Sequence, residues 1–481
     1  MRLIALAALC LLAACAAWNQ PLNPPLQGEN AGIVDQAKLE PGELYVGLAF
    51  SGGGMRASAF AYGMLEELKA QGVVTGTPNG VLDHVRLVTG VSGGSVTAAQ
   101  FGLYGPAGIQ GYRENYLLTN AEKYMANSVL NPVTLVKGLS GGANGRTTFA
   151  RYLDEVLFHK ATFADLRARS GIKTWINATD MANNTPFLFS PETFDALCSD
   201  LSKVPISEAV AASAAFPLVF SPIVLEAHQG KCDYREPDWL TAARNNPEAT
   251  SAMKAQARAL ESYANPEEVK FVKLLDGGIT DNFGTTGLAV ERARAQAAYA
   301  PMTPEEAVKM TRMLFLVANA GVEKDYSWTQ KVPGPGGLGL GMSIATASMS
   351  AATRSGYDAM KGELRNWQEE LVEWRCGLSL AEVRRLRGST NGWDCQDVKL
   401  FVGQASFEAV PKEMREKLNK VPTRLRLKPD EVDLVIEAGR LATRLTPEYN
   451  GFLAALDGNS VESRIAAGIA AGGRRIVPVG Q

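Results

Sequence analysis

Residues Leu87 to Ala99 read Leu-Val-Thr-Gly-Val-Ser-Gly-Gly-Ser-Val-Thr-Ala-Ala. A mostly apolar run, Val85 to Val88, leads into this stretch, and small residues that suit a helix follow it. The pattern predicts a strand, a tight turn and a helix, with Ser92 at the apex of a G-x-S-x-G turn. Glycines flank Ser92 because the turn leaves no room for side chains, and the strained backbone lifts the hydroxyl out of the sheet edge. Ser92 is therefore a candidate nucleophile, but a chain with 47 glycines makes chance matches easy, so the motif needs support from elsewhere.

A second glycine turn follows the first strand that we expect. Leu44 to Phe50 is a continuous apolar run, typical of a strand buried on both faces, and Gly52, Gly53 and Gly54 come shortly after it. Glycines at the start of a helix expose backbone N–H groups that stabilise a developing negative charge, so we interpret them as an oxyanion hole. Nucleotide binding is the competing interpretation, but neither G-K-[ST] nor G-x-G-x-x-G spacing is present. Arg56 would orient this loop, meet a phosphate, or lie solvated at the helix start.

A serine nucleophile needs a base within hydrogen-bond reach. Asp276 follows an expected strand, Val269 to Leu275, and precedes two glycines, so its carboxylate would project from the carboxyl end of the sheet that presents Ser92. Burial in an apolar site raises the pKa of an aspartate from about 3.9 toward a range useful for a base. A turn-forming Asp-Gly pair is the alternative. We expect Asp281 and Asn282, just beyond it, to shape the loop through side-chain to backbone hydrogen bonds.

Histidine is the usual base of a serine nucleophile, and the triad of an α/β-hydrolase runs Ser, acid, His along the chain. The chain has three histidines, His84, His159 and His228. A triad would need a carboxylate between Ser92 and one of the latter two, and neither of these follows a convincing strand. We interpret all three histidines as surface or packing residues, which leaves Asp276 as the preferred base.

Strands and helices alternate along the chain, which predicts an α/β fold with a mainly parallel central sheet and helices on both of its faces. The further elements that we expect are strands at 173–178, 313–320 and 398–402, helices at 205–215, 248–263 and 430–443, a surface insertion at 233–268 and an apolar loop at 331–342. That loop is either a plain connector or a flank of the site that acts as a lid or touches lipid.

The composition, 46% hydrophobic and 20% charged, is that of a globular protein with a substantial core. A formal net charge of −2 gives no electrostatic argument for nucleic acid or for a strongly anionic membrane surface. Apart from two cysteines near the N-terminus, four remain and allow three disulfide pairings; proximity favours Cys198 with Cys232 and Cys376 with Cys395. The absence of C-x-x-C spacing and the small number of histidines argue against a zinc site.

The first residues form a targeting segment rather than part of the fold. Arg2 precedes an apolar run, Leu3 to Leu12, and small residues lead from it to Cys15. This run is too short to span a bilayer, which takes about 20 apolar residues. The pattern resembles the lipobox of bacterial lipoproteins, which implies a signal peptide over 1–14 and a lipidated Cys15; an ordinary secretory signal is the alternative. Residues 15–43 are rich in proline and polar residues and are expected to be a tether.

Three short segments, taken in order, resemble the three motifs of the patatin-like phospholipases: residues 52–56, 90–94 and 276–278. Residues 212–217, Ala-Ser-Ala-Ala-Phe-Pro, are similar to the segment that this family carries between its second and third motifs. The resemblance covers roughly residues 44–290. It implies a three-layer α/β/α sandwich and lipid acyl hydrolase activity with no metal or other cofactor.

Carried over by position, the resemblance implies that Ser92 is the nucleophile, that Asp276 is its base in a dyad without histidine, and that Gly52, Gly53 and Gly54 form the oxyanion hole. The sequence departs from the family pattern at three positions that concern the shape of the loops. Ser51 and Ala57 stand where the family often has Asp and Gly, and Gly284 stands where it often has Pro.

From these patterns we expect a membrane-anchored serine hydrolase of the phospholipase A, lysophospholipase or esterase type, acting on membrane lipids or acyl esters and not on nucleic acid. The catalytic domain would span 44–325, and an extension over 326–481 would pack on the same domain. Ala16, after Cys15, resembles the pattern of lipoproteins sent to the outer membrane of Gram-negative bacteria. A lipoprotein that uses this fold only to bind lipid or a partner is the alternative.

Overall fold

A sheet of eight strands lies at the centre of the computed structural model, which describes residues 19–21, 23–27, 39–125, 144, 146–217, 219–323, 326–330 and 332–457. The strand order is β5-β6-β3-β2-β1-β7-β8, with β4 paired to β3. The strands are β1 (Leu44–Phe50), β2 (Val85–Val91), β3 (Lys173–Asp180), β4 (Thr185–Leu188), β5 (Ile223–Glu226), β6 (Phe271–Asp276), β7 (Arg312–Asn319) and β8 (Lys399–Ser406). All six predicted strands are present, and β4 and β5 are additional.

The sheet is parallel on one side and antiparallel on the other. Neighbouring strands from β8 through β7, β1 and β2 to β3 all run parallel, whereas β3 pairs antiparallel with β4 and β6, and β6 pairs antiparallel with β5. The prediction of a mainly parallel sheet therefore holds for the half that contains β1 and β2. It fails beyond β3 because β4 follows β3 through a tight turn, which allows only an antiparallel neighbour.

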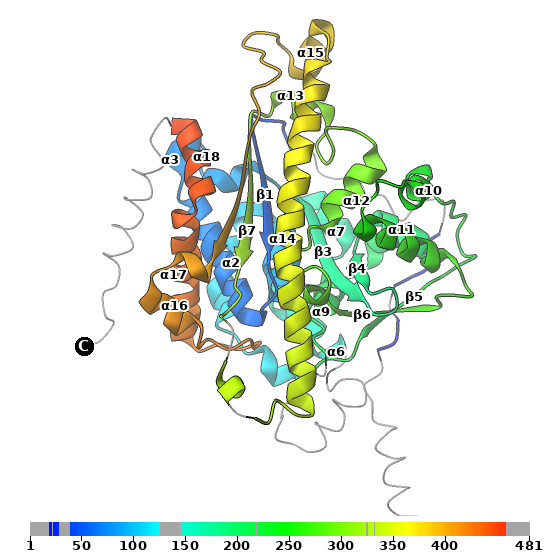
Figure 1. The fold of residues 1–481 in the computed structure, drawn as a ribbon, viewed down its shortest axis with the longest axis vertical. Coiled ribbons are helices and arrows are strands. Elements are labelled where there is room, and N and C mark those ends of the chain that lie inside the picture. Colours follow the sequence, from blue (N-terminus) through cyan, green and yellow to red (C-terminus); the bar gives the residue numbers. More distant parts are fainter. Residues whose placement is uncertain are drawn as a thin grey trace, which may run out of the picture.

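Alternate residues of the central strands belong to two separate hydrophobic cores. Val46 and Leu48 pack on one face with α2 (Gly54–Lys69), α4 (Gly93–Tyr104), α9 (Ile206–Ser213) and α17 (Pro429–Leu445). Tyr45 and Ala49 pack on the other face with α12 (Thr286–Ala295), α13 (Pro304–Lys309) and α14 (Leu338–Cys376). Figure 1 shows α14 crossing in front of the sheet. This arrangement confirms a three-layer α/β/α sandwich.

The α-helices are α2 (Gly54–Lys69), α3 (Gly72–Thr75), α4 (Gly93–Tyr104), α6 (Arg146–Leu153), α7 (Phe163–Arg169), α8 (Pro191–Ala196), α9 (Ile206–Ser213), α10 (Asp238–Asn245), α11 (Ser251–Ala264), α12 (Thr286–Ala295), α13 (Pro304–Lys309), α14 (Leu338–Cys376), α15 (Leu380–Arg387), α16 (Lys412–Leu418), α17 (Pro429–Leu445) and α18 (Pro447–Asp457). The predicted helices over 205–215, 248–263 and 430–443 correspond to α9, α11 and α17. The sequence pattern did not predict α18.

Two segments differ from their prediction. Helix α14 begins at Leu338, inside the expected loop 331–342, because helix formation propagates cooperatively from the well-packed later turns. The expected surface insertion contributes to the core: α11 buries Leu260 and Tyr263, and the Tyr263 hydroxyl donates a hydrogen bond to Asp180.

The segment expected to be a tether is partly attached to the folded body. Asn19 Nδ2 donates to the carbonyl oxygens of Ser221 and Pro222, and Asn23 exchanges hydrogen bonds with the backbone of Glu226 in β5. Figure 1 draws this segment in dark blue beside β5. The predicted signal peptide 1–14 and Cys15 lie outside the described residues.

The region after residue 325 is built into the same sheet and helical layer. β8 pairs in parallel with β7 along its whole length, and α17 packs on α2. Gly63 and Gly439 permit this close helix crossing: a Cβ on Gly63 would lie 2.1 Å from the carbonyl oxygen of Ile436, and one on Gly439 would lie 2.2 Å from that of Phe60.

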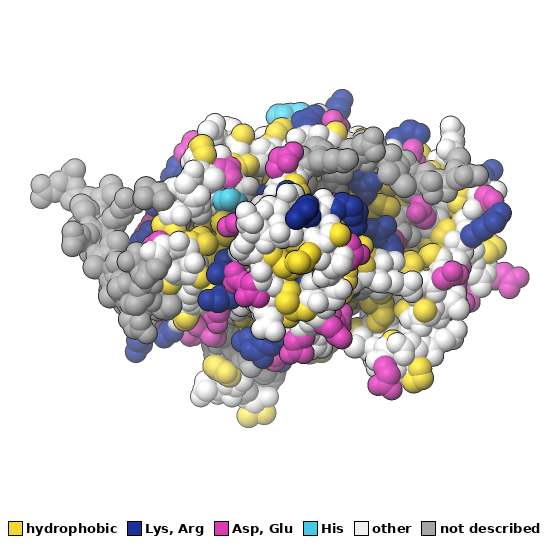
Figure 2. All heavy atoms as spheres, turned by 90° about the horizontal axis from the view of Figure 1, so that it is seen from above, with side chains coloured by type: hydrophobic (Ala, Val, Ile, Leu, Met, Phe, Trp, Pro, Cys, Tyr) yellow, Lys and Arg dark blue, Asp and Glu magenta, His cyan; other side chains and the backbone are white. Residues whose placement is uncertain are grey.

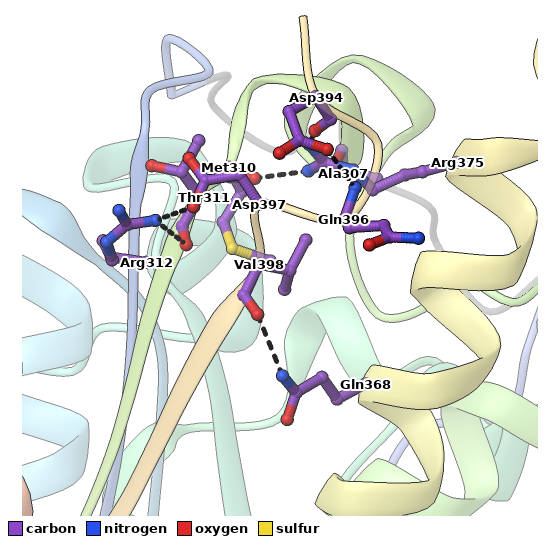
Figure 3. Close-up of polar contacts among 10 residues, drawn as sticks. All are labelled: Ala307, Met310, Thr311, Arg312, Gln368, Arg375, Asp394, Gln396, Asp397 and Val398. Atoms are coloured by element: carbon purple, nitrogen blue, oxygen red, sulfur yellow. Dashed lines mark hydrogen bonds and ion pairs between the residues drawn. The ribbon is translucent and has the colours of Figure 1, made fainter.

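The later half of α14 is fastened firmly to the sheet. Arg375 is buried and donates to the carbonyl oxygens of Ala307, Met310 and Asp394, and Gln368 Nε2 donates to that of Val398 at 2.9 Å (Figure 3). The disulfide from Cys376 to Cys395 closes the end of the helix, and Cys198 is bonded to Cys232. Both pairings that sequence proximity favours are therefore present.

Charges of both signs are distributed over the surface. Figure 2 shows the end of the molecule that carries α15, where the basic and acidic side chains of the described residues are interspersed. Among the residues that the structure describes, no helix is long and apolar enough to cross a membrane.

Candidate active site

Ser92 occupies the sharp turn between β2 and α4, as its motif predicts. Its backbone has φ of 52° and ψ of −125°, a conformation that costs a non-glycine residue on the order of 1–3 kcal/mol. The neighbouring glycines are sterically required, because a Cβ on Gly90 would lie 2.6 Å from the carbonyl oxygen of Gly94, and one on Gly93 would lie 1.9 Å from that of Gly54. The N–H of Ser92 donates to Ser213 Oγ at 2.9 Å.

Asp276 meets Ser92 from the antiparallel side of the sheet. Strand β6 runs opposite to β3 and pairs Asp276 with Ala178, next to Asn177, which pairs with Val91 at the end of β2. Asp276 therefore lies level with the end of β2, the strand that leads to Ser92, although β6 runs in the opposite direction. The Ser92 hydroxyl is close enough to the Asp276 carboxyl group to lower its pKa, so the structure brings these two predicted residues together.

The carboxyl group of Asp276 is almost completely buried, with 1% of the residue exposed. Burial raises its pKa from the ordinary value of 3.8 to about 6, while hydrogen bonds from the N–H of Gly278 and from Ser92 act in the opposite direction. The bond from Gly278 to Asp276 Oδ1 measures 2.9 Å. A carboxylate with this pKa is a stronger base than an ordinary aspartate and is ionised at neutral pH.

The glycine loop lies directly beside Ser92, since a Cβ on Gly52 would come within 3.3 Å of the Ser92 Cβ. The N–H of Gly52 is occupied, because it donates to Asn282 Oδ1 at 3.1 Å. Among the described residues, the N–H groups of Gly53 and Gly54 have no acceptor. Of the three predicted oxyanion donors, Gly53 and Gly54 therefore have N–H groups without an acceptor, whereas the Gly52 N–H attaches the loop to Asn282.

Arg56 is buried, and its position favours the orienting role among those considered from the sequence. Its Nε donates to the carbonyl oxygen of Ala320 at 3.1 Å, and its Nη1 donates to that of Val421 at 2.8 Å. Burial lowers the pKa of this guanidinium to about 10. Arg56 thus ties the glycine loop to segments that follow β7 and precede α17, and it is not a solvated residue at the helix start.

Helix α14 covers the site with residues that the motifs did not indicate. A Cβ on Gly278 would lie 2.5 Å from Cε of Met349, and Ser348 Oγ donates to the carbonyl oxygen of Ile279. Asn282 Nδ2 donates to Thr353 Oγ1 at 2.8 Å. No sequence signal marks these residues, because a contact between distant segments depends on how α14 packs.

The loop after Asp276 is shaped largely as expected. Asp281 accepts hydrogen bonds from the N–H groups of Phe283, Gly284 and Thr286. Gly284 has φ of 67°, which a proline cannot adopt, so the departure from the family pattern at this position reflects a different backbone conformation.

The histidines make no recorded contact with Ser92 or Asp276. His228 Nε2 pairs with the carbonyl oxygen of Asn23, His84 lies in a short helix before β2, and His159 ends a short helix after α6. Among the residues that the structure describes, no three His, Cys, Asp or Glu side chains are grouped so that they could hold a metal ion.

Three comparisons relate this chain to known proteins. Curated proteins give no significant match. Among solved structures, human GIVD cytosolic phospholipase A2 is 12% identical with a TM-score of 0.33, and the match covers 91% of this chain and 64% of that one. VipD from Legionella pneumophila is 12% identical with a TM-score of 0.26, over 96% of this chain and 80% of that one. The chain thus spans less than two thirds of the human enzyme, and we base no conclusion on similarities this low.

The family model described as patatin-like phospholipase matches residues 48–289. This range begins inside β1, contains the glycine loop and the serine turn, and ends in α12, just after the loop that follows Asp276. Since the match spans half of the sequence and includes both Ser92 and Asp276, the chain belongs to the patatin-like phospholipase family.

Proposed function

We propose that this protein is a serine lipid acyl hydrolase that cleaves carboxylic esters of membrane lipids with a Ser92–Asp276 dyad. The observation that carries the proposal is the proximity of Ser92 to a buried carboxyl group, that of Asp276, whose pKa burial raises to about 6. This arrangement supplies a nucleophile and a base within reach of each other, without a histidine.

In the first half of the reaction, Ser92 Oγ attacks the carbonyl carbon of the ester while Asp276 accepts the hydroxyl proton. The negative charge that develops on the carbonyl oxygen is stabilised by the N–H groups of Gly53 and Gly54 at the start of α2. The intermediate collapses with cleavage of the bond to the alcohol oxygen. Asp276 returns its proton to that oxygen, and the acyl group remains on Ser92.

In the second half, Asp276 removes a proton from a water molecule, and the hydroxide attacks the acyl carbon. The same glycine N–H groups stabilise the second oxyanion. Collapse breaks the bond to Oγ, the proton returns to Ser92, and the fatty acid leaves. The site is suited to these two reaction steps because the carboxyl group of Asp276 is ionised before each attack and can be protonated transiently at a low cost in free energy.

The proposal includes attachment to a membrane through Cys15. The pattern of Leu12 to Cys15 supports a signal peptide over 1–14 that is removed when Cys15 is acylated, and Ala16 is consistent with the outer membrane. Mass spectrometry of the N-terminal peptide tests this directly. Fractionation of a Cys15→Ala variant, which we expect to associate with membranes more weakly than wild type, tests it independently.

The catalytic proposal is tested with the full chain and two substrates, p-nitrophenyl butyrate and phosphatidylglycerol vesicles. We expect Ser92→Ala and Asp276→Asn each to lower turnover by about 10³-fold or more on both substrates, because the dyad acts as a unit. The exposed Ser355→Ala, which also removes a serine hydroxyl, is the matched control and should retain the wild-type rate. Wild-type turnover by Ser92→Ala would refute the proposal, and wild-type turnover by Asp276→Asn would require another base.

A further inference from the structure

A run of 22 residues without a charged side chain begins the C-terminal region. Residues 332–353 contain no Asp, Glu, Lys or Arg, and Lys331 and Arg354 flank them. The run includes the first four turns of α14, where residues 339–347 contain no buried residue. Apolar side chains are exposed along it: Val332 completely, Ile344 at 63% and Leu340 at 49%. Solvent-exposed helical turns usually carry charges, so an uncharged apolar segment of this length points to a surface that contacts something other than water.

This segment extends beyond the edge of the sheet at which the dyad lies. The later half of α14 contacts Met310 and Val398, just before β7 and β8 begin, whereas Met349 and Ser348 contact the site at the opposite edge. The turns before Ser348 therefore project past the carboxyl ends of the parallel strands. In Figure 1 they form the lower end of α14.

Other exposed apolar side chains gather at the same edge. Met181 directly follows β3, and Val322 and Tyr326 follow β7, with exposed fractions of 43%, 40% and 63%. Val219 lies shortly before β5, which begins level with the end of β3. The opposite end, drawn in Figure 2, carries interspersed basic and acidic side chains around α15. Of the large apolar side chains that are exposed in the described residues, most lie at the edge that bears the dyad, whereas Leu380 of α15 lies at the opposite end.

The position of Asn19 gives a separate indication of which end faces lipid. Its side chain is fixed to the carbonyl oxygens of Ser221 and Pro222, immediately before β5, at this same edge. Cys15 is four residues earlier, so at most about 14 Å of chain separates the two residues. An acyl group on Cys15 would therefore enter a membrane close to the apolar edge and not at the far end of the molecule.

We propose that the apolar edge docks on a phospholipid bilayer, with Val332, Leu340, Met342 and Ile344 inserted at the boundary between headgroups and acyl chains. Leu340, Met342 and Ile344 lie in the first turns of α14, whose later half is held firmly against the sheet, so their docking carries little ordering cost. Docking turns the glycine loop and the dyad toward the membrane, where a lipid substrate travels only a short distance to Ser92. The inference rests on the proposed lipid substrate, but its binding test is independent of catalysis.

The binding test places an environment-sensitive dye on Ile344→Cys in the full chain, with Ser92→Ala present so that vesicles stay intact. Leu380→Cys, an exposed apolar position in α15, is the matched control. With vesicles of phosphatidylethanolamine and phosphatidylglycerol, we expect a blue shift of the dye at position 344 and none at position 380. Equal shifts at both positions, or none at either, would overturn the proposed orientation.

The activity test compares a Leu340→Glu, Met342→Glu, Ile344→Glu triple variant with Leu380→Glu. We expect the triple variant to hydrolyse vesicle phospholipid roughly tenfold more slowly or worse, because carboxylates oppose insertion, while its turnover of monomeric p-nitrophenyl butyrate stays within about twofold. Leu380→Glu should change neither rate. Equal loss on both substrates would assign the segment to the site itself, and no loss on either would also refute docking. If the wild-type protein cleaves no ester, the catalytic proposal fails, and the dye experiment still tests the docking proposal.

Discussion

The carboxamide oxygen of Asn282 accepts a hydrogen bond from the backbone N–H of Gly52 at 3.1 Å, although 230 positions separate the two residues in the sequence. The same side chain donates from Nδ2 to Thr353 of α14. Asn282 therefore connects the glycine loop, the loop after Asp276 and the helix that covers the site. The position of Asn282 helps to set where the N–H groups of Gly53 and Gly54 point and, in the mechanism that we propose, how well they reach an oxyanion.

Replacement of Asn282 by alanine removes the acceptor for the Gly52 N–H in a buried position. We expect Asn282→Ala to lower kcat for a soluble ester by about tenfold or more and to reduce the free energy of unfolding by about 1–3 kcal/mol. Steady-state kinetics and urea unfolding measure the two effects. Thr353→Val, which removes only the α14 end of the connection, is the control and should affect kcat much less. Equal loss of kcat in both variants would contradict a specific role for the Gly52 bond.

The activity should depend on pH through Asp276. Burial raises the pKa of this carboxyl group to about 6, and only the ionised form accepts a proton from Ser92. We expect kcat/KM for p-nitrophenyl butyrate to rise with pH up to about 6 and to level off above it. A profile measured across this range checks the expectation. A midpoint near 4 would mean that the carboxyl group is hydrated during turnover.

The same pKa makes Asp276 a destabilising residue at neutral pH. Its pKa is raised in the folded state, so the neutral carboxyl favours folding below the ordinary value of 3.8, and this contribution is lost as pH rises through about 6. The ionised group then costs up to about 3 kcal/mol. We expect inactive Asp276→Asn to unfold at a higher denaturant concentration than wild type above pH about 7, with the difference disappearing below pH about 4. Equal stability at all pH values would contradict the raised pKa.

Steric fit at the turn that carries Ser92 gives a prediction that does not involve chemistry. Gly93→Ala would place a Cβ 1.9 Å from the carbonyl oxygen of Gly54, which forces the glycine loop and the Ser92 turn apart. We expect it to lose about 3 kcal/mol or more of stability, together with activity. Gly356→Ala in α14, where nothing lies within 4 Å, should gain up to about 1 kcal/mol. Thermal unfolding of both variants distinguishes a local steric clash at Gly93 from a general loss of stability when any helical glycine is replaced by alanine.

Much of the fold and the centre of the site follow from local patterns. Leu44 to Phe50 and the run before Ser92 are apolar because both faces of each strand are covered, so these continuous apolar runs can be recognised as strands without a structure. The glycines around Ser92 are required by the turn itself. The sequence could not indicate that β6 runs antiparallel, because strand direction depends on the connections between strands and not on the residues within them.

Other features of the site could not be predicted from the sequence for a different reason. Gly52 looks like its two neighbours in the sequence, and only the position of Asn282 distinguishes it as an attachment point. Ser213 lies in a segment that resembles the family, yet its role, accepting from the N–H of Ser92 and donating to the carbonyl oxygen of Asn177, depends on how α9 packs. Such contacts are specified jointly by distant parts of the chain.

The backbone contact between α2 and α17 determines how far the protein can be shortened. The family match ends at residue 289, before β7, α14 and α17, yet β1 pairs with β7, and Gly63 lies against the backbone of Ile436. A fragment that ends at that boundary would leave the backbone groups of β1 that pair with β7 without partners. It would also expose the surface around Gly63 on which α17 packs. The region after residue 289 lies outside the family match, but we expect the part of the chain that carries Ser92 and Asp276 to need it for folding.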